Sequence, residues 1–212
     1  MAMKKLNFNP RQYLTKRSSL KKVILEFSAA FMGVLVALAL NSWKESSRET
    51  AFIHEVVKSI YQDNQLNINN CQEQINHFTH HVDTFAHYLK DESLAINNII
   101  GKNGGFQFKS ASFTGFEILM QSDLVSKINY ELVFYLSMNK KSAEMKETFF
   151  MHSVDLLNDY MYDSGAEGKR KFKAHSRDLT GSCENFLNEA QKIDSLLLAK
   201  FPYILDERNL NN

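Results

Sequence analysis

The most apolar part of the chain is an 18-residue stretch from Val23 to Leu40, whose members are apolar or small except for Glu26 and Ser28. As a helix it would rise ~1.5 Å per residue and span ~27 Å, close to the thickness of the hydrocarbon core of a bilayer. Trp43 follows where an interfacial aromatic side chain belongs, and lysines flank both ends of the stretch. The pattern predicts one transmembrane helix over residues 23–43.

Two other interpretations of this stretch stay open. It could be a helix buried in a soluble core, although such a helix would be shorter and would not need a flank that is basic and free of acids. It could also be a cleaved signal peptide, because Ala37-Leu38-Ala39 has the small-x-small spacing of a cleavage site. We expect a retained signal anchor, since the basic region that precedes the stretch is long.

Small side chains repeat every four residues through the predicted span and share one helical face: Ala29, Gly33, Ala37 and Asn41, with Ala30 and Glu26 at its edge. In lipid, helices associate by close approach over such residues, so this face is a candidate packing surface for another transmembrane helix. Small residues are also common in membrane helices for no such reason. Glu26 either pairs with Lys22 one turn earlier or faces a partner helix or an ion path.

After Trp43, apolar positions alternate spacings of three and four residues, which is the heptad pattern of a helix that packs along others. The predicted seam comprises Ile68, Cys71, Ile75, Phe78, Val82, Phe85 and Leu89. The pattern predicts one long helix over about residues 44–91, either continuous with the membrane span or separate from it.

The glycine-rich stretch 101–112 interrupts the helical pattern, and Phe106-Gln107-Phe108 within it is a candidate for a short β-ribbon. Beyond it we expect a short helix at 113–121, opened by the capping-box pair Thr114 and Glu117. A turn at 123–127 and long helices at 129–162 and 177–200 follow. The last helix carries a second heptad seam, which comprises Leu179, Cys183, Phe186, Ala190, Ile193 and Leu197.

The expected fold class is all-α. A basic cytoplasmic tail (1–22) precedes the transmembrane helix (23–43), and residues 44–205 are expected to form an antiparallel helical bundle of three long helices and a short one. Residues 206–212 are expected to form a frayed tail.

Charge is distributed unevenly along the chain. Residues 1–22 hold seven basic side chains and no acidic one, whereas residues 44–212 hold 18 basic and 23 acidic side chains, a net charge of −5. A basic flank keeps its end of a membrane span in the cytoplasm, so the C-terminal domain is expected in the periplasm of a bacterium with the span in the inner membrane. The acidic body gives no electrostatic reason for nucleic-acid binding.

Cys71 and Cys183 both fall on predicted seams. Outside the cytoplasm they could form a disulfide that closes a loop of about 110 residues, or they could remain free thiols that serve as small core residues.

Four histidines cluster on the first predicted long helix. His77 and His81, one turn apart, are the candidates for a shared divalent metal ion or for pH sensing. We expect a solvated face and no metal site instead, because His80 and His87 point away from the predicted seam.

The sequence patterns of nucleophile elbows, phosphate-binding glycine loops, zinc sites and kinases do not occur in the chain. The phenylalanines at 106, 108, 113 and 116 are expected in the core rather than in an exposed ligand site. We therefore expect a protein that is not an enzyme and has no cofactor.

Two stretches of the sequence, GVLVALALNSW and SFTGFEILMQSDLVSKINYELVFYLS, resemble a group of single-pass inner-membrane proteins of Bacteroidetes with a helical periplasmic domain of unknown function. The resemblance covers roughly residues 20–140. The positions that correspond are Phe113, Phe116, Leu119, Leu124, Ile128, Leu132 and Tyr135. It implies an inner-membrane location and a helical periplasmic domain, and it implies no catalytic residues.

These observations favour a non-enzymatic accessory subunit of an inner-membrane complex, of the transport or motor type. The expected partners are the lipid bilayer and either an integral membrane protein or further copies of the chain, which pack through the small-residue face and the helical domain. The alternative is a sensor module whose helical domain binds a small ligand or responds to pH through the histidines.

Overall fold

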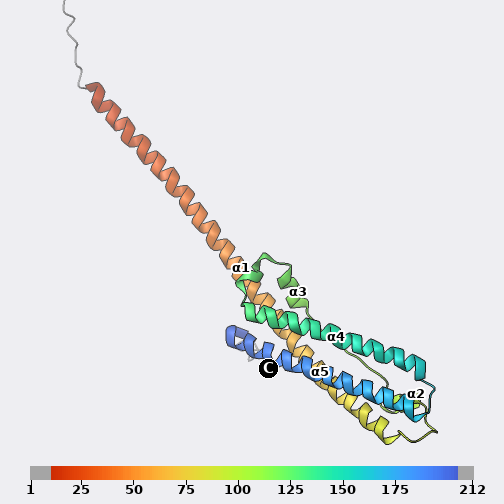
Figure 1. Ribbon diagram of the computed structural model, residues 1–212. Coiled ribbons are helices and arrows are strands. Elements are labelled where there is room, and N and C mark those ends of the chain that lie inside the picture. Colours follow the sequence, from red (N-terminus) through yellow and green to blue (C-terminus); the bar gives the residue numbers. More distant parts are fainter. Residues whose placement is uncertain (1–10, 205–212) are drawn as a thin grey trace, which may run out of the picture. The chain divides into compact units, whose positions relative to one another are not determined.

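We analysed a computed structural model of the chain, which describes the backbone of residues 11–204 and side chains from residue 22 onward. Every regular element among these residues is helical, which confirms the all-α prediction (Figure 1). The elements are α1 (Arg11–His87), α2 (Ile96–Lys102), α3 (Thr114–Met120), the 3-10 helix η1 (Asp123–Lys127), α4 (Tyr130–Tyr160) and α5 (Ala166–Lys200). The predicted ribbon at 106–108 is absent from the described residues. The predicted frayed tail and the first ten residues of the predicted basic tail lie outside them.

The chain divides into two compact units, Met1–Phe52 and Ile53–Asn212, which we describe separately. In the first unit, α1 contains an 18-residue window with a mean hydropathy of 2.3, long and apolar enough to cross a membrane. None of this window is buried. Leu25, Phe27 and Trp43 each expose 72% of their surface. The prediction of a long apolar N-terminal helix is therefore confirmed.

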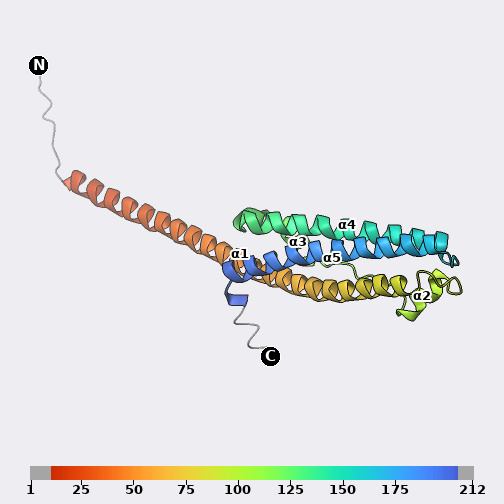
Figure 2. The same cartoon turned by 60° about the horizontal axis from the view of Figure 1, so that its bottom comes forward.

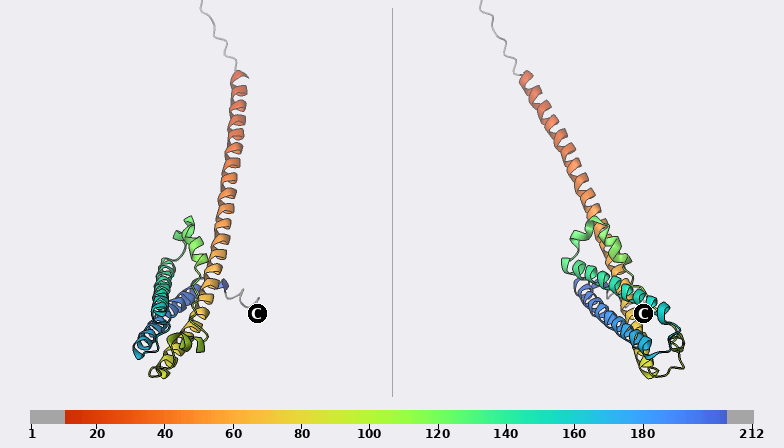
Figure 3. Two further views of the ribbon diagram at one scale, coloured as in Figure 1. Left: turned by 90° about the vertical axis from the view of Figure 1, so that its right-hand side faces the viewer. Right: turned by 45° about the vertical axis from the view of Figure 1, so that its right-hand side comes forward.

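In the second unit, α4 and α5 lie side by side, and the part of α1 after residue 53 runs along them (Figures 1 and 2). The two further views in Figure 3 show the same neighbours. Three clusters of buried apolar side chains occupy the space between them. Successive stretches of α1 contribute Val57 and Ile60 to the first cluster, Cys71 and Phe78 to the second and Phe85 to the third.

The buried face of α1 differs from the predicted seam. Its fully or almost fully buried side chains alternate spacings of three and four: Val57, Ile60, Asn64, Asn67, Cys71, Gln74, Phe78, His81 and Phe85. Four predicted positions are only half-buried, Ile68, Ile75, Val82 and Leu89, and the last lies beyond the end of α1. The polar residues Gln74 and His81 take the place of Ile75 and Val82 in the core. The predicted α5 seam is confirmed, because all six of its residues are fully buried.

The helices differ from the sequence patterns at four places. Helix α1 begins at Arg11, inside the predicted tail 1–22, and continues through the predicted span into the long helix that follows. Helix α2 was not predicted, and its first amides donate to carbonyl groups of the α4–α5 loop, Ile96 N to Asp163 O (3.0 Å) and Asn97 N to Met161 O (2.9 Å). Helix α5 begins at Ala166 rather than near residue 177. Lys169 in its first turns is buried, and its ammonium donates to the carbonyl oxygen of Asp91, between α1 and α2. The predicted capping box of α3 does not form, since Phe113 is the N-cap and makes no side-chain cap.

Candidate functional site

The predicted packing face of the apolar helix is exposed in the structure. Glu26, Ala29, Ala30, Gly33, Ala37 and Asn41 are all exposed. A Cβ atom placed on Gly33 would meet no atom within 4 Å among the described residues. The face is therefore open to another helix, and its role in packing stays a prediction.

The connecting segment 103–113, between α2 and α3, lies extended along α1 and is held there once per heptad. Asn67 makes two hydrogen bonds with Ser112. Asn67 Nδ2 donates to the carbonyl oxygen of Ser112 (2.7 Å), and Asn67 Oδ1 accepts from the amide of Ser112 (2.8 Å). Gln74 Nε2 donates to Lys109 O (3.2 Å), and His81 Nε2 lies 3.0 Å from Gly105 O. Asn67, Gln74 and His81 are seven residues apart, and each of them contacts the main chain of the segment, whereas the fourth buried polar side chain of this face, Asn64, donates to Ala190 O of α5 (2.9 Å).

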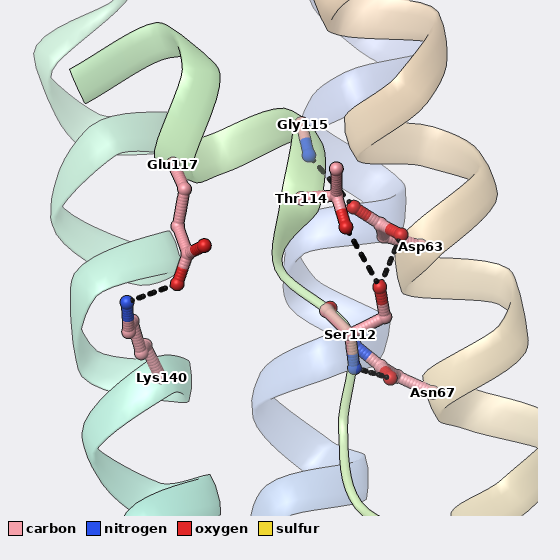
Figure 4. Close-up of polar contacts among 7 residues, drawn as sticks. All are labelled: Asp63, Asn67, Ser112, Thr114, Gly115, Glu117 and Lys140. Atoms are coloured by element: carbon pink, nitrogen blue, oxygen red, sulfur yellow. Dashed lines mark hydrogen bonds and ion pairs between the residues drawn. The ribbon is translucent and has the colours of Figure 1, made fainter. Parts of the chain in front are cut away.

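At its end, the connecting segment is fixed by a carboxylate of α1 (Figure 4). Asp63 Oδ1 accepts from Ser112 Oγ (2.6 Å), and Asp63 Oδ2 accepts from the amide of Gly115 (2.9 Å) in the first turn of α3. Gly115 meets α1 so closely that a Cβ atom there would lie 2.5 Å from the backbone nitrogen of Ile60. The absence of a side chain at Gly115 therefore permits α3 to contact α1.

A groove of about 430 Å³ lies between the connecting segment, α3 and α4. Its walls carry the hydroxyl groups of Ser110, Ser112 and Thr114 on one side and Ala143, Glu144 and Glu147 on the other. Glu117 on α3 and Lys140 on α4 form an ion pair, with Glu117 Oε1 2.6 Å from Lys140 Nζ, which Figure 4 shows beside the segment. These groups can form hydrogen bonds and ion pairs, which are the interactions that orient a bound molecule.

The histidines do not all lie on a solvated face as predicted. His80 and His87 are exposed, but His81 is fully buried beneath the connecting segment. Its Nδ1 lies 3.2 Å from Asn103 Nδ2, and its Nε2 lies 3.1 Å from His77 Nε2. Burial lowers the pKa of His81 to about 4, and the neighbouring His77 adds to the effect. Burial also lowers the pKa of His77.

No group of three or more His, Cys, Asp or Glu side chains is placed to hold a metal ion in the described part of the chain. His77 and His81 therefore stand as a pair without a third ligand of these types.

Cys71 and Cys183 are neighbours in the core, a question that their seam positions left open. Both are buried free thiols in this structure, and Cys71 Sγ donates to Cys183 O (3.0 Å). Contact with the Cys183 thiol, opposed by burial and assisted by the charge of Lys146, lowers the pKa of Cys71. The same contact raises the pKa of Cys183, and burial adds to the increase. A disulfide between the two residues stays a prediction.

The buried ammonium group of Lys146, on α4, was not found by sequence reasoning. Its side chain is 2% exposed, and Nζ donates to Gln74 Oε1 (3.0 Å). The same nitrogen lies 4.7 Å from the centre of the Phe186 ring and 5.2 Å from that of Phe108. Three of the buried polar positions on α1, Asn67, Gln74 and His81, share a sequence signal, their seven-residue spacing, which a search for apolar residues overlooks.

No protein-family model matches this sequence, and comparisons with curated proteins and with solved structures likewise find no match. The resemblance to Bacteroidetes membrane proteins therefore stays a prediction.

Proposed function

We propose that this chain is a membrane-anchored interaction protein without catalytic activity, an accessory subunit of an inner-membrane complex of the transport or motor type. Residues 23–43 cross the bilayer, the basic tail lies in the cytoplasm, and residues 44–205 form an antiparallel helical bundle in the periplasm. The supporting observation is that the most apolar window of α1 is not buried at all. Apolar surface of this extent is favourable only where lipid or another protein covers it.

The open face around Gly33 supports a partner helix in the membrane. In lipid, helices associate mainly by close packing of their backbones, which small side chains permit. Ala29, Gly33 and Ala37 are small enough to permit it. Most of the remaining exposed side chains of the stretch are large and apolar, as expected for lipid contact. The groove beside the connecting segment offers a second contact surface to the same complex.

The test is purification of the full chain from native membranes in a mild detergent, followed by mass spectrometry. A stoichiometric partner is expected, and Gly33→Leu should release it by blocking close approach. Leu35→Phe is the matched control, because it adds bulk on the opposite side of the same helix. A complex that survives Gly33→Leu would argue against this face.

Membrane topology has its own test. We expect activity from a reporter enzyme that is fused after Asn212 and that works only in the periplasm. Recovery of the full chain in the soluble fraction, or a mature chain that starts near Leu40, would overturn the membrane assignment.

A second candidate function, a pH-responsive module, is favoured by one observation. The His77–His81 pair sits under the connecting segment, and His81 contacts the main chain of Gly105. Protonation of the pair would place two N–H groups 3.1 Å apart and loosen the segment. A chain that purifies alone and changes the protease sensitivity of segment 103–113 between pH 7.5 and 4 would favour this function over the subunit.

A further inference from the structure

The only Asn-Gly pair in the sequence, Asn103-Gly104, lies at the C-terminal end of α2. Asn103 is the C-cap of this helix, and Gly104 follows with a φ of +79°, a conformation that favours glycine. Gly104 is exposed, and a Cβ atom placed on it would meet no atom within 4 Å among the described residues. Because glycine has no side chain that hinders its nitrogen, this nitrogen can reach the side chain of the preceding asparagine.

An asparagine before a glycine can lose its side-chain amide by reaction with the main chain. The nitrogen of Gly104 attacks Cγ of Asn103, the bond from Cγ to Nδ2 breaks, and ammonia leaves with the proton of the attacking nitrogen. A cyclic succinimide remains. Water then opens this ring at one of its two carbonyl carbons, and the product is aspartate or isoaspartate. Either product carries a carboxylate at position 103.

The amide of Asn103 lies between two side chains of α1. Its Nδ2 lies 3.2 Å from His81 Nδ1, and its Oδ1 accepts from Thr84 Oγ1 (2.9 Å), a hydroxyl that also lies 2.8 Å from His80 O. These contacts hold the amide in place, so the attack by Gly104 requires the side chain to leave them and ψ of Asn103 to rotate away from 13°. The rate of the reaction therefore depends on how often the start of the connecting segment opens.

The amide of Asn103 also fixes the neutral form of His81. Its Nδ2 is a donor and pairs with an unprotonated Nδ1, so the single hydrogen of the neutral ring is at Nε2, which lies 3.0 Å from Gly105 O. A carboxylate at position 103 can only accept. With this carboxylate at Nδ1 and a carbonyl group at Nε2, both contacts are satisfied only by the protonated ring, which donates from both nitrogens.

We propose that Asn103 is a site of spontaneous deamidation, and that the carboxylate formed there pairs with a protonated His81 at the start of the connecting segment. This inference concerns the second unit and does not rest on the proposed membrane function. His77 and His80, also on α1, are the other titratable groups that act on His81, and both oppose its charge. From the connecting segment, His81 also meets Gly105 O and the ring of Phe106. The modified chain should therefore lose less stability in acid than the native chain.

The first test incubates the full chain in detergent at mildly alkaline pH and follows its peptides by mass spectrometry. Acid should accumulate at position 103 faster than at any other asparagine. Thr84→Val should speed the reaction by about 2- to 10-fold, because it removes one hydrogen bond that holds the amide. Thr148→Val is the matched control, since Thr148 on α4 donates to a carbonyl group one turn earlier, as Thr84 does.

Two outcomes of this test would overturn the deamidation site. The first is a chain that stays unmodified at position 103 over a period in which a synthetic peptide of residues 98–108 is converted. The second is equal acceleration by Thr84→Val and Thr148→Val, because the contact with Asn103 would then have no part in the rate.

The second test uses Asn103→Asp, which carries the aspartate product in every molecule. Proton NMR titration should find the pKa of His81 raised from about 4 toward its ordinary value of 6.5, and His81→Gln identifies the signal. Asn98→Asp is the control, because it adds a carboxylate at an exposed position of the same short helix and should leave this pKa unchanged. An unaltered pKa of His81 in Asn103→Asp would contradict the pairing.

Discussion

His81 and His77 face each other on α1, with their Nε2 atoms 3.1 Å apart and their rings edge to face. When both imidazoles are neutral, the N–H at one Nε2 donates to the unprotonated Nε2 of the other ring, whereas protonation of both rings leaves two donors facing each other. Burial of His81 under the connecting segment therefore links the fold to pH.

We expect the second unit to lose stability as the pH falls from 6.5 toward 4. An unfolded histidine titrates at its ordinary pKa of 6.5, whereas that of His81 is lowered to about 4. Between pH 6.5 and 4 the histidine is protonated in the unfolded state but still neutral in the folded state. The free energy of unfolding therefore keeps its full value above pH 6.5 and falls by about 3 kcal/mol as the pH drops to 4. Urea denaturation at several pH values measures the slope. His81→Gln should flatten it, whereas His80→Gln, on the exposed neighbour, should not.

Gly115 and Gly181 should respond in opposite directions to alanine. At Gly115 the new Cβ would lie 2.5 Å from the backbone of Ile60, which cannot move without displacing α1, so we expect a loss of about 3 kcal/mol. At Gly181, inside α5, no atom lies within 4 Å of the new Cβ. Alanine there should add ~0.5–1 kcal/mol, because glycine weakens a helix interior. Thermal denaturation of both variants checks the pair, and a harmless Gly115→Ala would contradict the close approach.

Asn67→Ala should release the end of the connecting segment. The change removes both hydrogen bonds to Ser112 and leaves its amide and carbonyl without these partners, at a cost of about 2–3 kcal/mol. Amide hydrogen exchange should rise at Ser112 more than at α5. Asn69→Ala, on the exposed side of the same helix, provides the control. Unchanged exchange at Ser112 in Asn67→Ala would show that the segment is held by other contacts.

Gln74 and Lys146 should be coupled by about 2 kcal/mol. Gln74→Leu removes the acceptor of a buried ammonium group and should cost about 3 kcal/mol. In the Lys146→Met background no charge is left to satisfy, and the same change should cost about 1 kcal/mol, mainly for the bond to Lys109. A double-mutant cycle from urea denaturation gives the coupling. Additive effects would mean that Lys146 does not depend on Gln74.

The sequence predicted those parts of the fold whose partners are large apolar side chains at regular spacing. The α5 seam is the clearest case, since Leu179, Phe186 and Ile193 recur every seven residues and all are buried. On α1 the same reasoning favoured Ile75 and Val82 over Gln74 and His81. The polar pair is stabilised in the core by main-chain groups of the connecting segment, which no local pattern reveals.

The candidate site was predictable to a similar extent. Two cysteines on two seams left open whether Cys71 and Cys183 meet, because the seams do not fix the register between helices, and the structure brings Cys71 Sγ within 3.0 Å of Cys183 O. The burial of Lys146 was not predictable, because a lysine is expected to be exposed unless the group that accepts its hydrogen bond in the core is known. Helix α2 was missed for a related reason, since its first amides bind carbonyl groups far along the chain.

The anchors of the connecting segment fix how many residues it must contain. Asn67 and Gln74 are seven residues apart, so their positions on α1 differ by ~10.5 Å. The main-chain groups that they bind, on Ser112 and Lys109, are three residues apart, and three residues of fully extended chain reach at most about 10–11 Å. The chain between these two anchors is therefore close to its full extension, and we expect deletion of a single residue between Lys109 and Ser112 to weaken at least one of the two contacts.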